Sequence, residues 1–529
     1  MNAVVETPLW GREVEAGRVQ GHPCRLYANR PRSVGALLRD ARRWQEGART
    51  FIVEGERRLS FGAFEAAVAR VTEQLQSRGV RPGERIVLLA YNSIEWLAAF
   101  WAVQSLGAVA VLCNAWWSAQ ETSEAIADVE PAWVLADWLA KRGLQDDPNV
   151  IDMATVREWV NGGERPPLPP LPEVAEDALA IIMFTSGTTG RAKGALMSQG
   201  GVVANLQNLL VLTGRLPSEM SLDQPGTVSL LTVPLFHLAG VQVSISTLLT
   251  GGKLVLQEGR FDAGAVLRLI QQERVRVWGS IPTMVSRVLE HPDAVRYDVS
   301  SLRSIPMGGS AISPELRARI PQVFPGVKKS VGSLYGCTEA GGILAAGSAD
   351  TLRERPGCVG KALPVVELRI ANPDERGVGE IQARTPTVTL GVWGEAEGAT
   401  DEDGWVRTGD LGRVEGDYLY LSGRSKDIVI RAGENIACAH VEHCLLRHPA
   451  VQEVAVVPLP HADLGEEVAA VVVLREGQSA SAEELAAHAQ SLLGKFEVPS
   501  RWWLRREALP TNATGKIAKA ELKADWRGG

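Results

Sequence analysis

The sequence lacks the cysteine pattern of a disulfide-rich protein. Its 529 residues contain no CxxC pair, and its six cysteines are Cys24, Cys113, Cys337, Cys358, Cys438 and Cys444. Scattered cysteines are typical of reduced thiols in a reducing compartment. The N-terminal stretch "MNAVVETPLWGREVEAG" also lacks the basic-then-apolar order of a secretory signal. We therefore expect a cytoplasmic protein.

The sequence also lacks an excess of positive charge. Its formal net charge is −7, whereas a nucleic-acid-binding face needs a basic patch or stripe. We therefore expect no nucleic-acid partner. Hydrophobic residues make up 45% of the chain and charged residues 22%, proportions that favour an ordinary globular protein.

No apolar run is long and unbroken, although one stretch raises the question of a membrane span. It extends from Trp96 to Trp117, and the residues that interrupt it are Gln104, Ser105, Gly107 and Asn114. This punctuation favours a buried helix from about Ser93 that ends at Gly107, followed by a buried strand "AVAVLC". We therefore expect no transmembrane segment.

Apolar, β-branched runs alternate with helical patterns along most of the chain. The stretches "ERIVLLAYN", "VSLLTVPLF", "KLVLQ" and "VRVWGSIP" predict strands, and "AGAVLRLIQQERV" predicts a helix between two of them. This alternation is typical of an α/β protein whose parallel or mixed sheets are covered by helices. Five prolines between Pro166 and Pro172 predict a stiff surface connection.

The length of the chain favours two domains, because a single hydrophobic core rarely extends so far. Near residues 400–426 a turn-rich polar segment precedes a smaller α+β pattern. That pattern comprises a helix from about Ala439, strands "VQEVAVVPLP" and "EVAAVVVLRE", and a helix from Ser481. We place the boundary at 424–426, between a large α/β domain (1–424) and a small α+β domain (425–529).

A loop rich in hydroxyls and glycines follows the apolar run that starts at Ile181. In "FTSGTTGRAKG" the hydroxyls belong to Thr185, Ser186, Thr188 and Thr189, the glycines are Gly187 and Gly190, and the cation is Lys193. Glycines let backbone N–H groups approach an anion, and lysine adds a mobile charge. The loop suits the β- and γ-phosphates of ATP, although its spacing differs from the common triphosphate loop. A flexible surface loop is the alternative.

Two other stretches offer oxygen ligands and an aromatic face. In "YGCTE", Thr338 and Glu339 provide a hydroxyl and a carboxylate that suit Mg²⁺, and Tyr335 offers a ring for adenine. In "RTGD", the Asp410 carboxylate suits vicinal ribose hydroxyls. Cys337 has no general base nearby in the sequence, so we interpret it as a packed small residue.

Five ordered motifs resemble those of the acyl-adenylate-forming enzymes, which include acyl-CoA synthetases, adenylation domains and firefly luciferase. They are "FTSGTTGRAKG", "VPLFHLAGV", "SLYGCTEAGG", "WVRTGDLG" with "GRSKDIVIRAGENI", and "LPTNATGKIAKAEL". Together they cover nearly the whole chain, and five in order are far more specific than one. The resemblance implies that superfamily's fold, a large N-terminal multi-sheet α/β domain followed by a small mobile α+β domain.

The resemblance also assigns roles to individual residues. It implies that Thr338 and Glu339 contact the α-phosphate and the metal, and that Arg424 reaches the ribose. The glycine-rich stretch that passes adenine and the acyl group matches Gly309, Ser310 and Ala311. Lys426 stands at the hinge between the domains. The predicted acyl pocket consists of Leu238, Ala239, Leu334, Gly336 and Gly341, with no charged residue among them.

Lys516 is the single most important residue that the resemblance indicates. The matching lysine reaches from the small domain into the large one, where a cation between the attacking carboxylate and the α-phosphate stabilises the transition state. The alternative is a solvated lysine on a basic terminal helix with Lys519 and Lys523. His237 matches a gate between the carboxylate pocket and the thiol tunnel, although a lone histidine beside apolar residues is usually structural.

The implied reaction is the formation of acyl-AMP from a carboxylic acid and ATP with Mg²⁺, followed by transfer to the thiol of CoA. Gly433 would line the path of the pantetheine arm. The chain departs from the commonest pattern at Ala437, Cys438 and His440, and with "SQGG" at 198–201. An amine acceptor, as in stand-alone amide synthetases of this superfamily, therefore stays open. The pocket favours a medium to bulky hydrophobic or aryl acid, as in fatty-acid or aryl-acid metabolism.

Two further points stay open in the sequence. In "HVEHCLLRH", one helix face is expected to carry His440, Cys444 and His448, plus His443, which could bind zinc. Such coincidences are common, and an ordinary amphipathic helix is favoured. The oligomeric state is not determined by the sequence, with a homodimer as one option.

Overall fold

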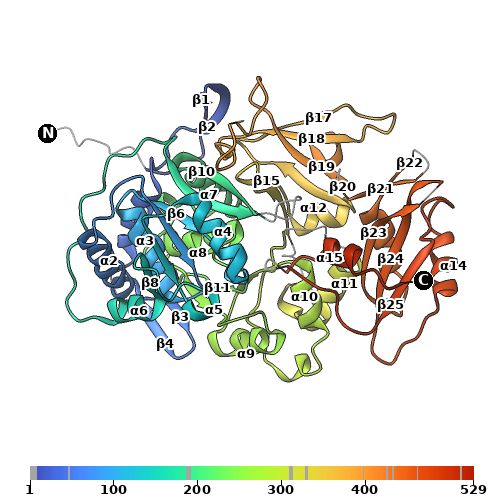
Figure 1. Cartoon of the computed structure of the whole chain (residues 1–529), viewed down its shortest axis with the longest axis horizontal. Helices are drawn as coiled ribbons and strands as arrows, with labels where there is room; N and C mark the ends of the chain where they lie inside the picture. The colour runs from blue at the N-terminus through green and yellow to red at the C-terminus, as the bar shows by residue number, and fades with distance from the viewer. Residues whose placement is uncertain are drawn as a thin grey trace.

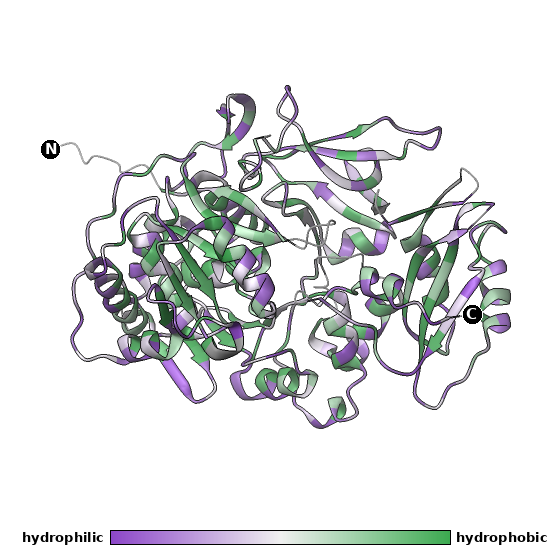
Figure 2. Cartoon of the chain, viewed as in Figure 1, coloured by the Kyte–Doolittle hydropathy of each residue, from purple (hydrophilic) through white to green (hydrophobic). Residues whose placement is uncertain are grey.

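The computed structural model describes residues 9–528 except 46–47, 186–191, 309–311, 313, 328–331, 397, 425–426, 432–433, 462 and 513–514. The sheets and helices of the N-terminal region form the larger part of the molecule, and the C-terminal region, orange to red, lies beside it (Figure 1). Hydrophobic residues concentrate on the strands of the large sheets, and hydrophilic residues lie mainly on outer helices and loops (Figure 2).

The first large sheet contains six strands in the order β10-β9-β6-β5-β7-β8. All neighbours are parallel except β10, which runs antiparallel to β9. Its strands are β5 (Arg85–Leu89), β6 (Val109–Leu112), β7 (Trp133–Ala136), β8 (Val150–Asp152), β9 (Leu179–Thr185) and β10 (Lys193–Ser198). The helices between them are α3 (Ile94–Ser105), α4 (Ala119–Val129), α5 (Leu139–Arg142) and α6 (Met153–Asn161).

The apolar stretch near Trp96 forms the predicted buried helix and strand. Ser93 caps α3 by accepting a hydrogen bond from the Trp96 backbone N–H, and every residue of α3 is buried. Gly107 then turns the chain at a positive φ of 67°, and the buried strand β6 follows. Among the described residues, no helix is both long and apolar enough to cross a membrane.

The second large sheet has the order β13-β11-β12-β3-β4. Its strands are β3 (Thr50–Glu54), β4 (Arg57–Ser60), β11 (Val228–Leu231), β12 (Lys253–Leu256) and β13 (Val277–Gly279). The helices that accompany it are α1 (Val34–Asp40), α2 (Phe61–Ser77), α7 (Gln199–Thr213), α8 (Leu238–Leu249), α9 (Ala263–Glu273), α10 (Pro282–Leu289) and α11 (Pro314–Val323). One hydrophobic core joins both large sheets and confirms the predicted α/β class.

A third sheet of seven antiparallel strands follows, in the order β14-β15-β16-β20-β19-β18-β17. Its elements are β14 (Ser333–Cys337), β15 (Gly342–Gly347), α12 (Ala349–Glu354), β16 (Cys358–Ala362), β17 (Glu367–Ala371), β18 (Gly379–Arg384), β19 (Val406–Glu415) and β20 (Tyr418–Arg424). The "YGCTE" motif therefore lies at the end of β14 and in the turn after it, and the "RTGD" motif lies on β19 of the same sheet.

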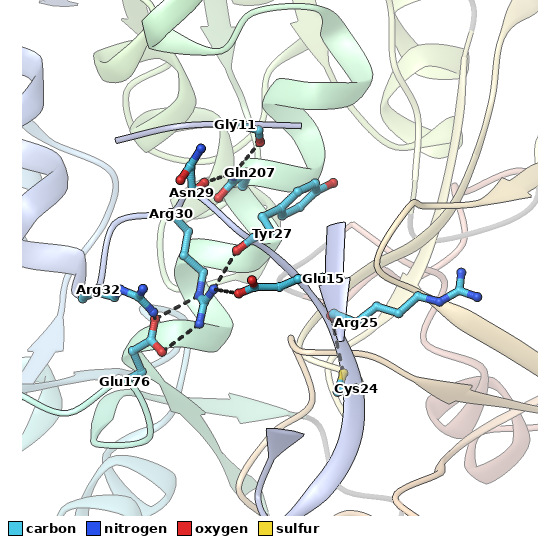
Figure 3. A network of polar contacts seen from close by, with 10 residues as sticks. All are labelled: Gly11, Glu15, Cys24, Arg25, Tyr27, Asn29, Arg30, Arg32, Glu176 and Gln207. Atoms are coloured by element: carbon cyan, nitrogen blue, oxygen red, sulfur yellow. Dashed lines mark hydrogen bonds and ion pairs between the residues drawn. The ribbon is translucent and has the colours of Figure 1, made fainter. Parts of the chain in front are cut away.

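An N-terminal hairpin, β1 (Val14–Val19) and β2 (His22–Tyr27), is tied to the large domain through arginines (Figure 3). The Arg30 guanidinium donates to both Glu176 oxygens at 3.0 Å and to the Tyr27 carbonyl at 2.6 Å. Arg32 donates to the same carboxylate, and both arginines lower the pKa of Glu176 against the effect of its burial. Gln207 of α7 donates to the Gly11 and Asn29 carbonyls, so the hairpin is anchored to the helix that follows β10.

The C-terminal region has its own sheet and its own hydrophobic core. Its elements are β21 (Ile428–Arg431), β22 (Glu434–Ala437), α13 (Cys438–Leu446), β23 (Val451–His461), β24 (Gly465–Leu474), α14 (Ala482–Gln490), β25 (Arg501–Arg505) and α15 (Lys519–Ala524). The predicted boundary at 424–426 falls between β20 and β21, where residues 425–426 lie outside the described part, so it stays a prediction.

Candidate active site

A cleft of about 2760 Å³ is lined by residues of both the large domain and the C-terminal region. It brings together most of the described residues that the motifs singled out. These residues are His237, Leu238, Ala239, Leu334, Tyr335, Gly336, Thr338, Glu339, Asp410 and Lys516. Because they come from four separate stretches of the sequence, the fold gathers the motifs into one place.

Lys516 enters the cleft on a tight hairpin of the C-terminal region. Thr511 and Ile517 form an antiparallel bridge, the Asn512 N–H donates to the Lys516 carbonyl at 2.8 Å, and the Lys516 N–H donates to Asn512 Oδ1 at 3.0 Å. Gly515 has a φ of 78° and packs against α10, where an added Cβ would lie 2.5 Å from Ile281 Cδ1. Only glycine suits this conformation and this close approach.

His237 lies beside Lys516 at the start of α8. Its carbonyl accepts the backbone N–H groups of Gly240 and Val241 at 2.9 and 3.1 Å, which fixes the residue at the helix N-terminus. Burial, together with the nearby charge of Lys516, lowers the pKa of His237 to about 4. The imidazole is therefore neutral at pH 7 and adds no second positive charge next to Lys516.

Tyr335 and Asp410 form a buried hydrogen-bonded pair between β14 and β19. The Tyr335 hydroxyl donates to Asp410 Oδ2 at 2.9 Å, and both residues are 6% exposed. Burial and the negative charge of Asp410 raise the pKa of Tyr335, so the phenol stays a neutral donor. The Asp410 backbone N–H also donates to Thr408 Oγ1 at 3.1 Å. These contacts hold the carboxylate in one orientation at the wall of the cleft.

Thr338 and Glu339 lie in the turn that connects β14 to β15. The Thr338 carbonyl accepts the Gly341 N–H at 2.9 Å, and the Glu339 carbonyl accepts the Thr389 hydroxyl at 3.0 Å. The Glu339 side chain is exposed. In the described part of the chain, no three His, Cys, Asp or Glu side chains gather into a metal cage. One carboxylate and one hydroxyl still fit Mg²⁺, which is usually held by one or two carboxylates and substrate phosphates.

The ends of the predicted phosphate loop lie opposite each other. Thr185 closes β9, Lys193 opens β10, and the two residues are register partners in the antiparallel pair. Lys193 Nζ lies 2.6 Å from Glu395 Oε1. The predicted ligands Ser186, Gly187, Thr188 and Thr189 lie outside the described residues, as do Gly309, Ser310, Ala311, Lys426, Gly433 and the side chains of Thr185 and Arg424.

Two sequence expectations differ from the structure. Gly341 does not line the cleft, because its Cα faces the Thr387 carbonyl, where an added Cβ would lie at 1.7 Å, and the neighbouring Gly342 lines it instead. His448 does not share a helix face with His440 and Cys444, because α13 ends at Leu446. The His448 ring packs edge-on against His488 at 5.2 Å, which gives it a packing contact.

Comparison with models of known protein families assigns the chain to a family. The family model described as AMP-binding enzyme matches residues 38–393, and the family model described as AMP-binding enzyme C-terminal domain matches residues 440–516. The chain belongs to the AMP-binding enzyme family. This AMP-binding enzyme is 34% identical to feruloyl-CoA synthase of an Amycolatopsis species, covering 90% of this chain and 95% of that one. It is 32% identical to indoleacetate–CoA ligase of Aromatoleum aromaticum, with the same coverage. It is therefore an AMP-forming acid–CoA ligase family enzyme.

Solved structures agree with this AMP-binding enzyme over nearly its whole length. ATP-bound MatB from Rhodopseudomonas palustris has a TM-score of 0.82 at 26% identity and covers 93% of this chain and 99% of that one. The amide bond synthetase McbA from Marinactinospora thermotolerans has a TM-score of 0.78 at 28% identity and covers 93% and 100%. They confirm the predicted fold of a large N-terminal and a small C-terminal domain.

Several residues at the site of this AMP-binding enzyme were not predicted from the sequence. Asn512, which braces the Lys516 hairpin, lies within "LPTNATGKIAKAEL", where an Asn followed closely by Gly is a local signal of a turn. The cleft also contains Arg215 and Gln242, although the motif residues indicated an acyl pocket without charge. No local signal indicates them, because α7 and α8 approach each other only in the folded chain.

Proposed function

We propose that this enzyme activates a medium to bulky hydrophobic or aryl carboxylic acid with ATP and Mg²⁺, and then transfers the acyl group to CoA. The main support for this proposal is the position of the Lys516 hairpin beside His237. In this position the lysine of the small domain lies in the cleft with residues of the large domain. The two relatives named above, a feruloyl-CoA synthase and an indoleacetate–CoA ligase, support an aryl acid.

In the first half-reaction the substrate carboxylate attacks the α-phosphorus of ATP, the bond to the β-phosphate oxygen breaks, and acyl-AMP and pyrophosphate form. Lys516 is positioned to lie between the two anions that approach each other, where its charge stabilises the transition state more than the ground state. Asp410 would hold the ribose hydroxyls and Tyr335 would stack on adenine. Lys193 and the loop before it would bind the leaving pyrophosphate.

Thr338 and Glu339 would hold Mg²⁺, which neutralises phosphate charge when it is bound. A neutral His237 suits the adenylation step, because a protonated imidazole would compete with Lys516 for the substrate carboxylate. Its position between Lys516 and the residues of α8 supports the role of a gate beside the acyl site.

In the second half-reaction the thiol sulfur of CoA attacks the acyl carbon of acyl-AMP, and AMP leaves. We place the two domains at 1–424 and 425–529, with Lys426 as the hinge about which the small domain turns. Rotation would withdraw Lys516 and present Gly433 to the thiol path. Hinges of this kind absorb large backbone changes at a few residues between rigid bodies.

An amine is the second candidate acceptor. The structural likeness to the amide bond synthetase McbA favours it, as do the unusual residues Ala437, Cys438 and His440 on the face that CoA would approach. His440 is exposed, with its Nε2 4.0 Å from Glu497 Oε1. All six cysteines are buried, and scattered cysteines of this kind, typical of reduced thiols, support the proposed cytoplasmic location.

One experiment separates these functions. Purified enzyme receives ATP, Mg²⁺ and a panel of aryl and aliphatic acids, with CoA or free amines, and pyrophosphate, acyl-CoA and amide are followed separately. We expect pyrophosphate release and acyl-CoA with at least one aryl or bulky hydrophobic acid. We also expect Gly433→Leu to abolish acyl-CoA formation while leaving pyrophosphate release intact. Wild type that ignores CoA and makes amide would establish the second candidate instead.

A further inference from the structure

Helix α8 lines the cleft along its whole length. The residues of α8 and its C-cap that face the cleft recur at helical spacing: Leu238, Ala239, Gln242, Val243, Ser246, Thr247 and Thr250. From His237 to Thr250 the helix rises about 20 Å at 1.5 Å per residue. The cleft therefore extends from the Lys516 hairpin to the far end of α8, which is a path long enough for an extended acid.

Residues of two strands also line this path. Thr227 precedes β11 and Ser229 lies within it, and both line the cleft, as do Val277 and Gly279 of β13. Alternate residues of a strand face the same side, so each strand presents one face to the cleft. Gly252, which follows α8, lies against Thr227 and Thr247, so these residues meet at the end remote from His237.

The chemistry of the wall changes along the path. Near His237 it is apolar, with Leu238, Ala239 and Val243, whereas the remote end carries hydroxyls and one cation. Two of these hydroxyls already bond to their own helix, Ser246 to the Val243 carbonyl at 3.1 Å and Thr250 to the Ser246 carbonyl at 2.8 Å. Their donor capacity is therefore used within α8.

Arg215 is the cation at the remote end. Its backbone N–H donates to the Leu210 carbonyl at 2.8 Å after α7 ends, and its Nη1 donates to Thr227 Oγ1. Among the described residues, no Asp or Glu contributes to its electrostatics, and burial together with the nearby Arg276 lowers its pKa. A guanidinium has five N–H donors, and Arg215 lines the cleft, so donors other than the one bonded to Thr227 can bond a ligand there.

Gln242 lies midway along the same face of α8. It is 8% exposed, it lines the cleft, and its Nε2 has no hydrogen-bond partner. A buried amide without a partner costs free energy unless a ligand or water satisfies it. The Gln242 amide without a partner and the Arg215 guanidinium both line one acyl path, and together they point to a substrate that carries its own acceptor atoms.

We propose that Gln242 and Arg215 select acids that carry a hydrogen-bond-accepting oxygen, a carbonyl or a carboxylate, at the end remote from the reacting carboxyl group. This rests on the proposed activation of an acid in this cleft. An acid with a methyl end would bury the same area but leave the donors unpaired, and a site built to bond such a group discriminates strongly against the analogue that lacks it.

The first test uses wild-type enzyme and acids matched in length that end in a methyl group, a methyl ketone or a carboxylate. Initial rates of pyrophosphate release give kcat/KM for each acid. We expect the oxygen-ended acids to exceed the methyl-ended acid by roughly ten- to a hundredfold, as for a hydrogen bond to a charged group. Equal values across the series, or a preference for the methyl end, would overturn the assignment.

The second test uses the variants Arg215→Ala and Gln242→Leu, with Arg268→Ala on the exposed side of α9 as a control. We expect Arg215→Ala to lower kcat/KM roughly tenfold or more for the carboxylate-ended acid. Gln242→Leu should affect the ketone-ended acid most, and both variants should retain or improve the rate with the methyl-ended acid. That unchanged rate shows that each variant is folded.

A loss that is equal for all three acids would refute selection by these residues. If a variant does not fold, Arg215→Lys and Gln242→Asn supply the comparison, because each retains a donor at a shorter or altered reach. The two proposals fail differently: no pyrophosphate with any acid of the panel would refute the proposed function, whereas pyrophosphate without selectivity would refute only the roles of Arg215 and Gln242.

Discussion

At the scale of single residues, Lys516 concentrates the chemistry of the first half-reaction. Its hairpin is braced by Asn512 and packed against Ile281, so its position does not depend on the side chain alone. We expect Lys516→Ala to slow pyrophosphate release by roughly 10²–10³, the usual loss for one electrostatic stabiliser, and to spare CoA attack on pre-made acyl-AMP. Lys523→Ala on α15 is the matched control. Equal losses in both half-reactions would contradict the assignment.

His237 provides a pH-dependent prediction at the same scale. Its pKa of about 4 in the folded chain lies below the 6.5 of a free imidazole, so the unfolded chain binds the proton first as pH falls. Above pH 6.5 both states are neutral and there is no effect on stability, whereas between 6.5 and 4 the folded state loses stability. We expect His237→Gln to reduce the fall in Tm between pH 7 and 5, and the exposed His440→Gln to leave it unchanged. If the fall in Tm between pH 7 and 5 were the same in the His237→Gln and His440→Gln variants, His237 would not be a buried neutral group.

At the scale of elements, helix α10 connects the two domains in this arrangement. Glu290 at its end accepts from Arg475 at 2.8 Å and Gln452 at 2.5 Å in the small domain, and from Arg319 of α11 at 3.1 Å. One turn earlier, Arg287 lies 3.5 Å from the Glu453 carboxylate, which also accepts the Leu509 N–H at 2.7 Å. These half-buried contacts stabilise the orientation that holds Lys516 in the cleft.

Removing the Glu290 contacts should shift the balance between the two orientations. We expect Glu290→Ala to slow pyrophosphate release about three- to tenfold, because an interaction of roughly 1 kcal/mol changes the population of a state by that factor. Acyl transfer from pre-made acyl-AMP to CoA should stay unchanged or become faster. Asp293→Ala, a partly exposed acid three residues after Glu290, is the control. A slower transfer step with unchanged pyrophosphate release would reverse the interpretation.

At the scale of the whole molecule, the sequence predicted what short segments encode by themselves. The buried helix before Gly107, the strand β6 and the capped helix α14 each depend on a local pattern and a local cap. Lys516 and Asp410 could be identified because each lies within a motif. Arg30, Arg215 and Glu290 could not, because their partners lie on separate segments and meet only when the chain folds. Gly341 does not line the cleft although its neighbour Gly342 does, a difference of one position in the turn after β14 that no local pattern indicates.

The arrangement of the domains supplies the last prediction. All six natural cysteines are buried, so cysteines introduced at the surface can be modified selectively. Arg319 of the large domain and Gln452 of the small one contact the same Glu290 carboxylate, so their side-chain ends lie close together. The variant Arg319→Cys with Gln452→Cys, joined by a short cleavable bis-maleimide, should therefore be held in the orientation with Lys516 in the cleft.

We expect one turnover of pyrophosphate release and an accumulation of acyl-AMP, with acyl-CoA formation restored when the linker is cleaved. The same variant treated with a monofunctional maleimide should complete both half-reactions. If the joined enzyme formed acyl-CoA as fast as the unjoined one, the second half-reaction would need no rotation of the small domain, and the hinge at Lys426 would lose its role.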